Sequence, residues 1–135
     1  RVVYQDITRI DKAIEEGEFF KNDAFKTAME RLTDDNALHL VGLLSNGGVH
    51  SSINHLFALI DLCKRENINK VYYHMFLDGR DTYEKSALTY LDQLQVKIEE
   101  IGIGKINIIT GSTCYLFPFE SDTFFRTLNA YKRRS

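Results

Sequence analysis

The stretch ALHLVGLLSNGGVHSSINHLFALIDLC, residues 37–63, decides the fold. Its first nine residues form a short apolar run that ends in a serine, which is typical of a strand buried on both faces of a parallel sheet. After this run, apolar side chains recur at i, i+3, i+4 and i+7, and this spacing predicts a helix from about 51 to 66. A buried strand that leads directly into an amphipathic helix indicates one half of a βαβ unit.

The same alternation continues along the chain. Residues 70–77, KVYYHMFL, are rich in β-branched and aromatic side chains and predict a second strand. A long helix is expected over about 84–101, and a third strand over 105–110, KINIIT. Short connections between these elements predict a parallel sheet with right-handed crossovers. We therefore expect an α/β fold, a three-layer parallel βαβαβ unit.

Two short helices are expected before the sheet and one after it. Asp6 can cap the first helix, which Gly17 ends, and Asn22 with Asp23 can cap the second. The segment 112–121 has no clear period, and a last helix is expected over about 122–131. Residues 1–135 are thus interpreted as a single, partial domain.

Composition excludes several classes of protein. A hydrophobic content of 44% with 27% charged residues indicates a globular chain, and no apolar run approaches the roughly 20 residues that span a bilayer. A formal charge of −2 offers no overall field that would attract nucleic acid or an anionic membrane. The two cysteines, Cys63 and Cys114, suggest neither a disulfide framework nor a thiolate metal site. A soluble, cytoplasmic protein is expected, and the start at Arg1 favours a fragment.

Polar residues follow each of the three predicted strands. Ligands of open parallel sheets bind outside the carboxyl ends of the strands, where the loops into the helices converge. These polar loops are therefore expected to share one rim of the sheet. Their residues are Ser45, Asn46, Gly47, Gly48 and His50 after the first strand, Asp78, Gly79, Arg80 and Asp81 after the second, and Gly111 and Ser112 after the third.

The first of these loops allows two interpretations. Gly47 and Gly48 let the backbone approach an anion closely, but they match neither the Walker nor the dinucleotide-binding glycine pattern, and this favours a plain tight turn. His50 can donate a hydrogen bond to a phosphate or carboxylate oxygen, and the alternative is a hydrogen-bonded loop histidine. Ser51 and Ser52 are interpreted as helix caps.

The second loop carries the stronger chemical signal. Arg80 can present its planar guanidinium to a carboxylate or phosphate, and Asp81 can accept a proton from a hydroxyl group. The alternative is an ordinary turn at Asp78 followed by an ordinary helix cap. The two remaining strand histidines, His39 and His74, are interpreted as satisfied residues of the sheet.

Four segments together resemble the cofactor-independent phosphoglycerate mutases, bimetal enzymes of the alkaline-phosphatase superfamily that interconvert 3- and 2-phosphoglycerate. The resemblance runs nearly continuously over residues 1–111. The segments are VVYQDITRIDKAIEEGEFF (2–20), LHLVGLLSNGGVHSSINHLFALIDLC (38–63), VYYHMFLDGRDTYEKSALTYLDQL (71–94) and GIGKINIITG (102–111).

The resemblance implies which part of the enzyme this chain represents. The family has a domain that holds two divalent metals, usually Mn²⁺, with a serine that is transiently phosphorylated, and an inserted domain that grips phosphoglycerate. The present chain is similar to the first part of the inserted domain. The family's Asn-Ser-Glu-Val-Gly-His nucleophile motif and its metal ligands do not occur in it. The resemblance thus implies no metal bound by this chain, no turnover without the metal-binding domain, and phosphoglycerate as the small-molecule partner.

Three residues correspond to family site positions. The resemblance implies that His50 binds substrate, that Arg80 and Asp81 hold the glycerate, and that Asp81 is the proton acceptor for the attacking hydroxyl. From the glycine at position 111 the family reads Gly-Arg-Tyr-Tyr-Ala-Met-Asp-Arg-Asp, whereas here Ser112 stands in place of the first arginine and segment 112–121 diverges. Loss of two cationic contacts of roughly 1.5–3 kcal/mol each would weaken binding by orders of magnitude. A non-catalytic binding module or a decayed remnant is the alternative.

Overall fold

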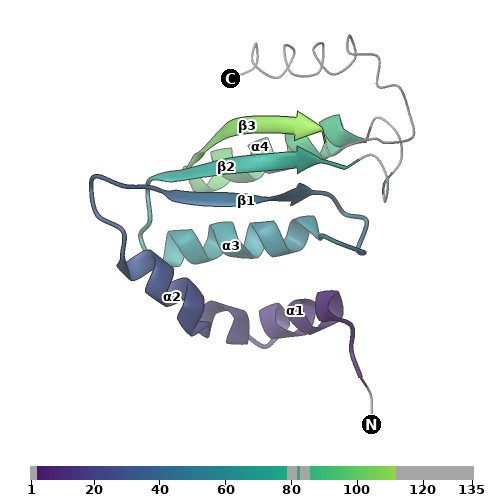
Figure 1. Ribbon diagram of the computed structural model, residues 1–135, viewed down its shortest axis with the longest axis horizontal. Coiled ribbons are helices and arrows are strands. Elements are labelled where there is room, and N and C mark those ends of the chain that lie inside the picture. Colours follow the sequence, from purple (N-terminus) through teal and green to yellow (C-terminus); the bar gives the residue numbers. More distant parts are fainter. Residues whose placement is uncertain (1–2, 79–81, 83–85, 112–135) are drawn as a thin grey trace.

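The computed structural model describes residues 3–78, 82 and 86–111 of the chain (Figure 1). The predicted helix over 122–131 and the divergent segment 112–121 therefore lie outside the described residues. The elements in chain order are α1 (Asp6–Glu15), the 3₁₀ helix η1 (Glu18–Lys21), α2 (Asp23–Glu30), β1 (Leu38–Leu44), α3 (Ile53–Arg65), β2 (Val71–Leu77), α4 (Ala87–Ile101) and β3 (Lys105–Gly111).

The three strands form one parallel sheet in the order β1-β2-β3, which confirms the predicted α/β fold and its βαβαβ unit. β1 and β2 pair without interruption from Leu38 opposite Val71 to Leu44 opposite Leu77. The pairing of β2 with β3 shifts register once, between Tyr73 and His74. All three strands end at the same edge of the sheet (Figure 1).

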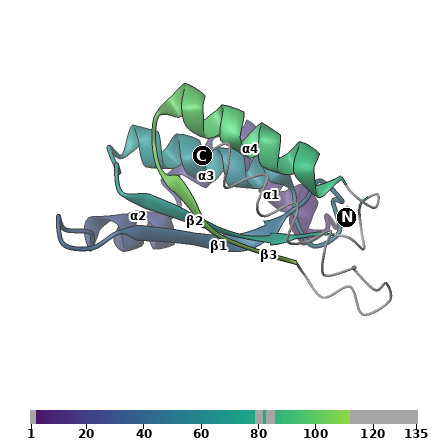
Figure 2. The ribbon, with the colours of Figure 1, turned by 90° about the horizontal axis from the view of Figure 1, so that it is seen from above.

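Helices α3 and α4 pack side by side on one face of the sheet (Figure 2). Right-handed crossovers between successive neighbouring strands place both helices on the same face. The core lies between these helices and the sheet, while on the opposite face Val41 is 65% exposed and Phe76 is 41% exposed. The described residues therefore supply two of the three expected layers. The buried core comprises Met29, Leu44, Ile53, Ile60, Leu62, Cys63, Val71, Tyr73, Met75, Leu77, Leu91, Leu94, Ile98 and Ile103.

The N-terminal helices pack next to α3, and α2 contributes Met29 to the core. The ring Nε2 of His55 in α3 lies 2.7 Å from Oδ1 of Asp11 in α1 and links the two helices. Asn22 caps α2 as predicted, because its side-chain oxygen accepts hydrogen bonds from the backbone N–H groups of residues 24 and 25. The predicted cap at Asp6 is wrong, since Gln5 occupies the N-cap position and Asp6 pairs with Arg9 at 3.1 Å within α1. In the part of the chain that the structure describes, no helix combines the length and the hydropathy needed to cross a membrane.

The turn from α4 into β3 depends on Gly104. This residue has a φ of +88°, and a Cβ at this position would lie 2.4 Å from Cε2 of Tyr73. The Tyr73 ring is fully buried, and its hydroxyl donates a hydrogen bond to the carbonyl of Ile103 at 3.0 Å. Burial raises the pKa of the Tyr73 hydroxyl, so this group stays protonated and keeps donating. Close packing of Tyr73 thus requires a glycine at position 104.

We expect Gly104→Ala to lower the free energy of unfolding by about 2–5 kcal/mol, because left-handed backbone strain adds to overlap with Tyr73. Gly102→Ala is the matched control, since Gly102 has a φ of +74° but no atom within 4 Å of the added Cβ. The control is expected to cost only the strain, about 1–2 kcal/mol. Urea denaturation followed by circular dichroism measures the free energy of unfolding of both variants. Equal losses of this free energy would contradict the steric role of Tyr73.

Candidate functional site

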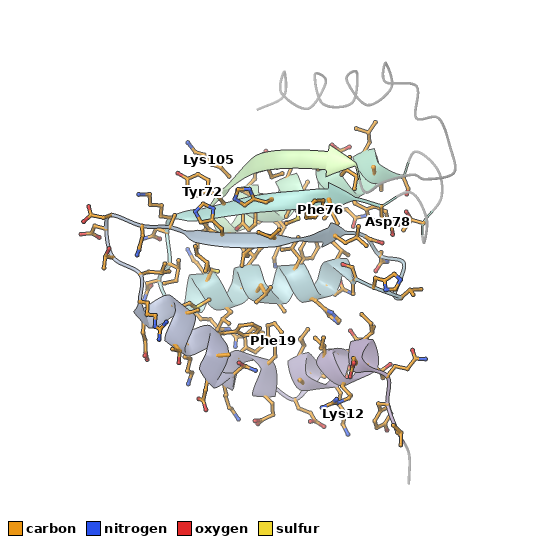
Figure 3. The ribbon with its side chains drawn as sticks, in the orientation of Figure 1. Lys12, Phe19, Tyr72, Phe76, Asp78 and Lys105 are labelled. Carbon is orange, nitrogen blue, oxygen red and sulfur yellow. The ribbon has the colours of Figure 1, made fainter. Side chains whose placement is uncertain are left out.

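A buried hydrogen bond joins the ends of β1 and β2. Ser45 follows β1 and Asp78 follows β2, and the parallel register places these two positions next to each other. The Ser45 hydroxyl donates to Oδ2 of Asp78 at 2.5 Å, with the two residues only 1% and 5% exposed. A carboxylate buried at this depth needs a hydrogen-bonding partner, so this contact fixes where both loops leave the sheet. Figure 3 labels Asp78 at this edge.

The Gly47-Gly48 turn is held by internal hydrogen bonds. The backbone N–H of Gly47 donates to the Ser45 hydroxyl at 3.0 Å, and that of Gly48 donates to the carbonyl of Ser51 at 3.0 Å. Gly48 has a φ of +71°, which favours glycine at this position. Both N–H groups are thus used within the turn, and this favours the tight-turn interpretation over direct anion binding by these two groups.

The prediction that Ser51 and Ser52 cap α3 is wrong. The Ser51 hydroxyl donates instead to the carbonyl of Leu43 at 2.6 Å and holds the loop against the end of β1. Ser52 occupies the N-cap position, but its side chain makes no cap hydrogen bond. The Ser51 side chain therefore stabilises the loop that carries His50 and not the helix that follows it.

The structure places one of the three predicted site residues. His50 lies exposed in the loop between β1 and α3, at the edge of the sheet where the strands end. Arg80 and Asp81 lie outside the described residues, so their contact with His50 stays a prediction. The residues that flank this pair in sequence are described: the Thr82 hydroxyl donates to the backbone carbonyl of Asp78 at 3.3 Å. This hydrogen bond ties both flanks of the loop segment to the rim.

The sequence places Asp78 among the polar residues of the rim, with an ordinary turn as the alternative, but it does not predict the buried contact with Ser45. A signal was available, because a carboxylate directly after a run of buried residues must be either solvated or paired. The choice between these two states depends on the register of β1 against β2. That register is a tertiary feature, which a single sequence does not fix.

Neither the Cys63 thiol nor a cluster of metal ligands forms a catalytic site in the described residues. Burial raises the pKa of the Cys63 thiol to about 11, so it stays protonated near neutral pH and is a poor nucleophile. Within residues 3–78, 82 and 86–111, no group of three or more His, Cys, Asp or Glu side chains is arranged to hold a metal ion. The divalent metals that the family resemblance implies therefore have no ligand set in the described part of the chain.

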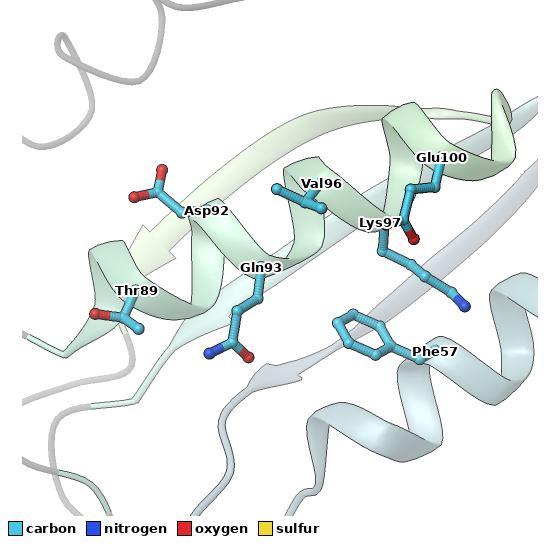
Figure 4. Close-up of a pocket in the computed structure, with 7 residues that line it drawn as sticks. All are labelled: Phe57, Thr89, Asp92, Gln93, Val96, Lys97 and Glu100. Atoms are coloured by element: carbon cyan, nitrogen blue, oxygen red, sulfur yellow. The ribbon is translucent and has the colours of Figure 1, made fainter.

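An open groove of about 470 Å³ runs between α3 and α4 (Figure 4). Lys97 closes one side, where its ammonium group pairs with Asp61 at 2.9 Å and lies 5.7 Å from the centre of the Phe57 ring. His50, the predicted site residue that the structure describes, does not line this groove. Its lining comprises Phe57, Thr89, Asp92, Gln93, Val96, Lys97 and Glu100, a mixture that is typical of solvated helix faces.

Comparisons with known proteins agree on one family. The family model described as the N-terminus of BPG-independent PGAM matches residues 10–129. The chain is 52% identical over 112 residues to the 2,3-bisphosphoglycerate-independent phosphoglycerate mutase of Staphylococcus saprophyticus and 51% identical to that of Staphylococcus aureus. Each alignment covers 82% of this chain but 22% of the relative, so the chain spans about a fifth of the length of these relatives.

A solved structure supports the same relationship. The fold is similar to that of phosphoglycerate mutase from Leishmania mexicana, crystallised at low cobalt concentration, with a TM-score of 0.73 and 28% sequence identity. The match covers 78% of this chain and 20% of the Leishmania chain. The described α/β unit thus corresponds to a part of a larger protein.

We expect Ser45→Ala to lower the free energy of unfolding by about 1–3 kcal/mol, because the buried Asp78 carboxylate loses its hydroxyl donor. Ser52→Ala is the matched control, since Ser52 is also buried but makes no cap hydrogen bond, and its cost should stay within about 0.5 kcal/mol. Urea denaturation of the 135-residue chain measures both values. A loss for Ser45→Ala no larger than that of the control would contradict the structural role of the pair.

Proposed function

Because this chain belongs to the 2,3-bisphosphoglycerate-independent phosphoglycerate mutase family, we propose that it forms the first part of the substrate-gripping domain of such an enzyme. The parent reaction interconverts 3- and 2-phosphoglycerate through a phosphoserine. The substrate is a small dianionic phosphate ester with a carboxylate, so its recognition requires cations and hydrogen-bond donors. The proposed partner in catalysis is the metal-binding domain of the family. The proposed compartment is the cytoplasm.

One observation carries this proposal. The parallel pairing of β1 with β2 brings the loop of His50 and the loop that begins at Asp78 to the same edge of the sheet. Loops at the carboxyl edge of a parallel sheet are where α/β proteins bind ligands. The position of His50 at that edge supports its role as a substrate contact.

The proposed division of roles follows from side-chain chemistry. His50 donates a hydrogen bond to a phosphate or carboxylate oxygen of the substrate. Arg80 forms a two-pronged contact with a second anionic group, and Asp81 accepts the proton of the hydroxyl that attacks phosphoserine. Ser45 and Asp78 are positioning residues, because they are buried and act through the loops that they anchor.

The family's two divalent metals do not fit the described residues, which contain no suitable group of three ligands. No step of the proposed role therefore runs through a metal bound by this chain. The 135 residues also lack the family's serine motif, so the chain supplies substrate contacts and not the nucleophile.

Binding of 3-phosphoglycerate tests the proposal directly. We expect titration to shift the imidazole NMR signals of His50, with weak, millimolar affinity because the two family arginines after Gly111 are replaced. Arg80→Ala should abolish the shift, while Lys97→Ala removes a distant cation and should leave it unchanged. His55, which pairs with Asp11, serves as an internal reference. No shift at His50, or equal loss in both variants, would indicate a non-catalytic module or a decayed remnant.

Turnover is expected to be absent in the isolated chain. Purified protein should not convert 3-phosphoglycerate to 2-phosphoglycerate, with or without added Mn²⁺, because phosphoryl transfer needs the missing serine and the metals that position it. A coupled assay that detects 2-phosphoglycerate measures this. Activity that co-purifies with the chain and is lost in Asp81→Asn would contradict the assignment of a substrate-gripping part alone.

A further inference from the structure

Two histidines meet on the sheet face that the described helices leave uncovered. In the register of β1 with β2, His39 lies opposite Tyr72 and Val41 lies opposite His74, so the two histidines are diagonal neighbours on that face. Nδ1 of His39 lies 2.8 Å from Nε2 of His74. The ring centres are 5.0 Å apart, with 32° between the ring planes.

This contact requires the two rings to share a proton. A neutral imidazole has one N–H donor and one lone pair, so one of the two facing nitrogens donates while the other accepts. When the donor ring carries its proton on its outer nitrogen instead, which is the other neutral tautomer, both facing nitrogens present lone pairs. A divalent transition metal is the species that can replace a proton between two such nitrogens.

The spacing of the rings fits a single shared ion. Metal–nitrogen bonds of about 2.1 Å that meet at about 90–100° place the two nitrogens about 3.0–3.2 Å apart and the ring centres about 4.6–5.0 Å apart. The observed 2.8 Å and 5.0 Å lie close to these values. At 2.8 Å between the nitrogens and 5.0 Å between the ring centres, the two rings point almost directly at each other, so both must turn until their lone pairs converge on one ion. Rotation about the side-chain torsions would supply this turn without movement of the strands.

We propose that His39 and His74 form a two-histidine binding site for a late first-row divalent ion such as Ni²⁺. His39 ligates through Nδ1 and His74 through Nε2. An angle near 90° suits the octahedral or tetragonal geometry of Ni²⁺ and Cu²⁺ better than the closed tetrahedral geometry of structural Zn²⁺. Because no third His, Cys, Asp or Glu ligand joins the pair among the described residues, water fills the remaining positions.

A neighbouring aromatic ring holds the imidazole of His39 in place. Tyr72 stacks on His39 with ring centres 5.4 Å apart and 25° between the planes. Both strands are fixed by continuous parallel pairing, so little order is lost when an ion binds. Across the sheet, His39 pairs with Tyr72 and Tyr72 pairs with Lys105. Lys105 is the nearest cation in this row of paired residues, and two strand spacings, roughly 10 Å, separate it from His39. At this separation its repulsion is largely screened at physiological salt.

Ion binding would link β1 to β2 and stabilise the folded chain by mass action. The test uses the untagged chain with Cys114→Ser, so that neither a tag nor that thiol binds the probe. Calorimetric titration with NiCl₂ should give one ion per chain, and the thermal unfolding midpoint should rise with Ni²⁺ concentration. His39→Ala and His74→Ala should each weaken binding by at least about tenfold, because the chelate is lost.

A matched control removes a histidine that lies elsewhere. His50→Gln should bind Ni²⁺ like the parent chain, since His50 lies in the loop beyond β1. Zn²⁺ titration of the parent chain, read from imidazole ¹⁵N shifts, tests the ligating atoms without any substitution, and changes are expected at Nδ1 of His39 and Nε2 of His74. Equal binding by the parent chain and both alanine variants, or shifts at other histidines only, would overturn the proposal.

Discussion

The in-register parallel pairing of β1 with β2 is the constraint on which the rest of the structure depends. It aligns Leu44 with Leu77 at the last paired position, and the residues that follow, Ser45 and Asp78, then meet at 2.5 Å although 33 positions separate them in sequence. A slip of β2 by one residue relative to β1 would turn the buried side chains of the slipped strand to the opposite face of the sheet. The alternating burial of β2, in which residues at odd positions face the helices, excludes such a slip.

The buried pair at the end of these strands connects the core to the rim. Asp78 lies next to Leu77 of the core, yet its carboxylate needs a donor because burial removes water. The Ser45 hydroxyl meets this need and at the same time accepts the N–H of Gly47, which sets the start of the glycine turn. The loop of His50 is thus positioned by the same hydrogen bond that satisfies the carboxylate.

Much of the fold could be predicted from sequence, because periodicity reports burial and burial decides strands and helices. The strands at 38–44 and 71–77 and the helix at 53–65 lie within two residues of their predicted bounds. Local signals were less reliable, although Asp6 and the two serines before α3 are good caps by type. Gln5 holds the N-cap position of α1, the Ser51 hydroxyl bonds the end of β1, and the Ser52 side chain makes no cap hydrogen bond. Contacts across the sheet, such as His39 with His74, need the register and could not be read from the chain alone.

The features that stabilise this unit differ from those that would act on a ligand. Ser45, Asp78 and Gly104 are buried or tightly packed and determine whether the chain folds. In the second set, His50 is exposed, so exchanging it would cost little stability, while Arg80 and Asp81 lie outside the described residues. Selection for folding alone therefore keeps the first set and places no demand on the second. A chain of this family with an altered segment after Gly111 can retain its α/β unit in full, and only ligand measurements distinguish a working rim from a preserved scaffold.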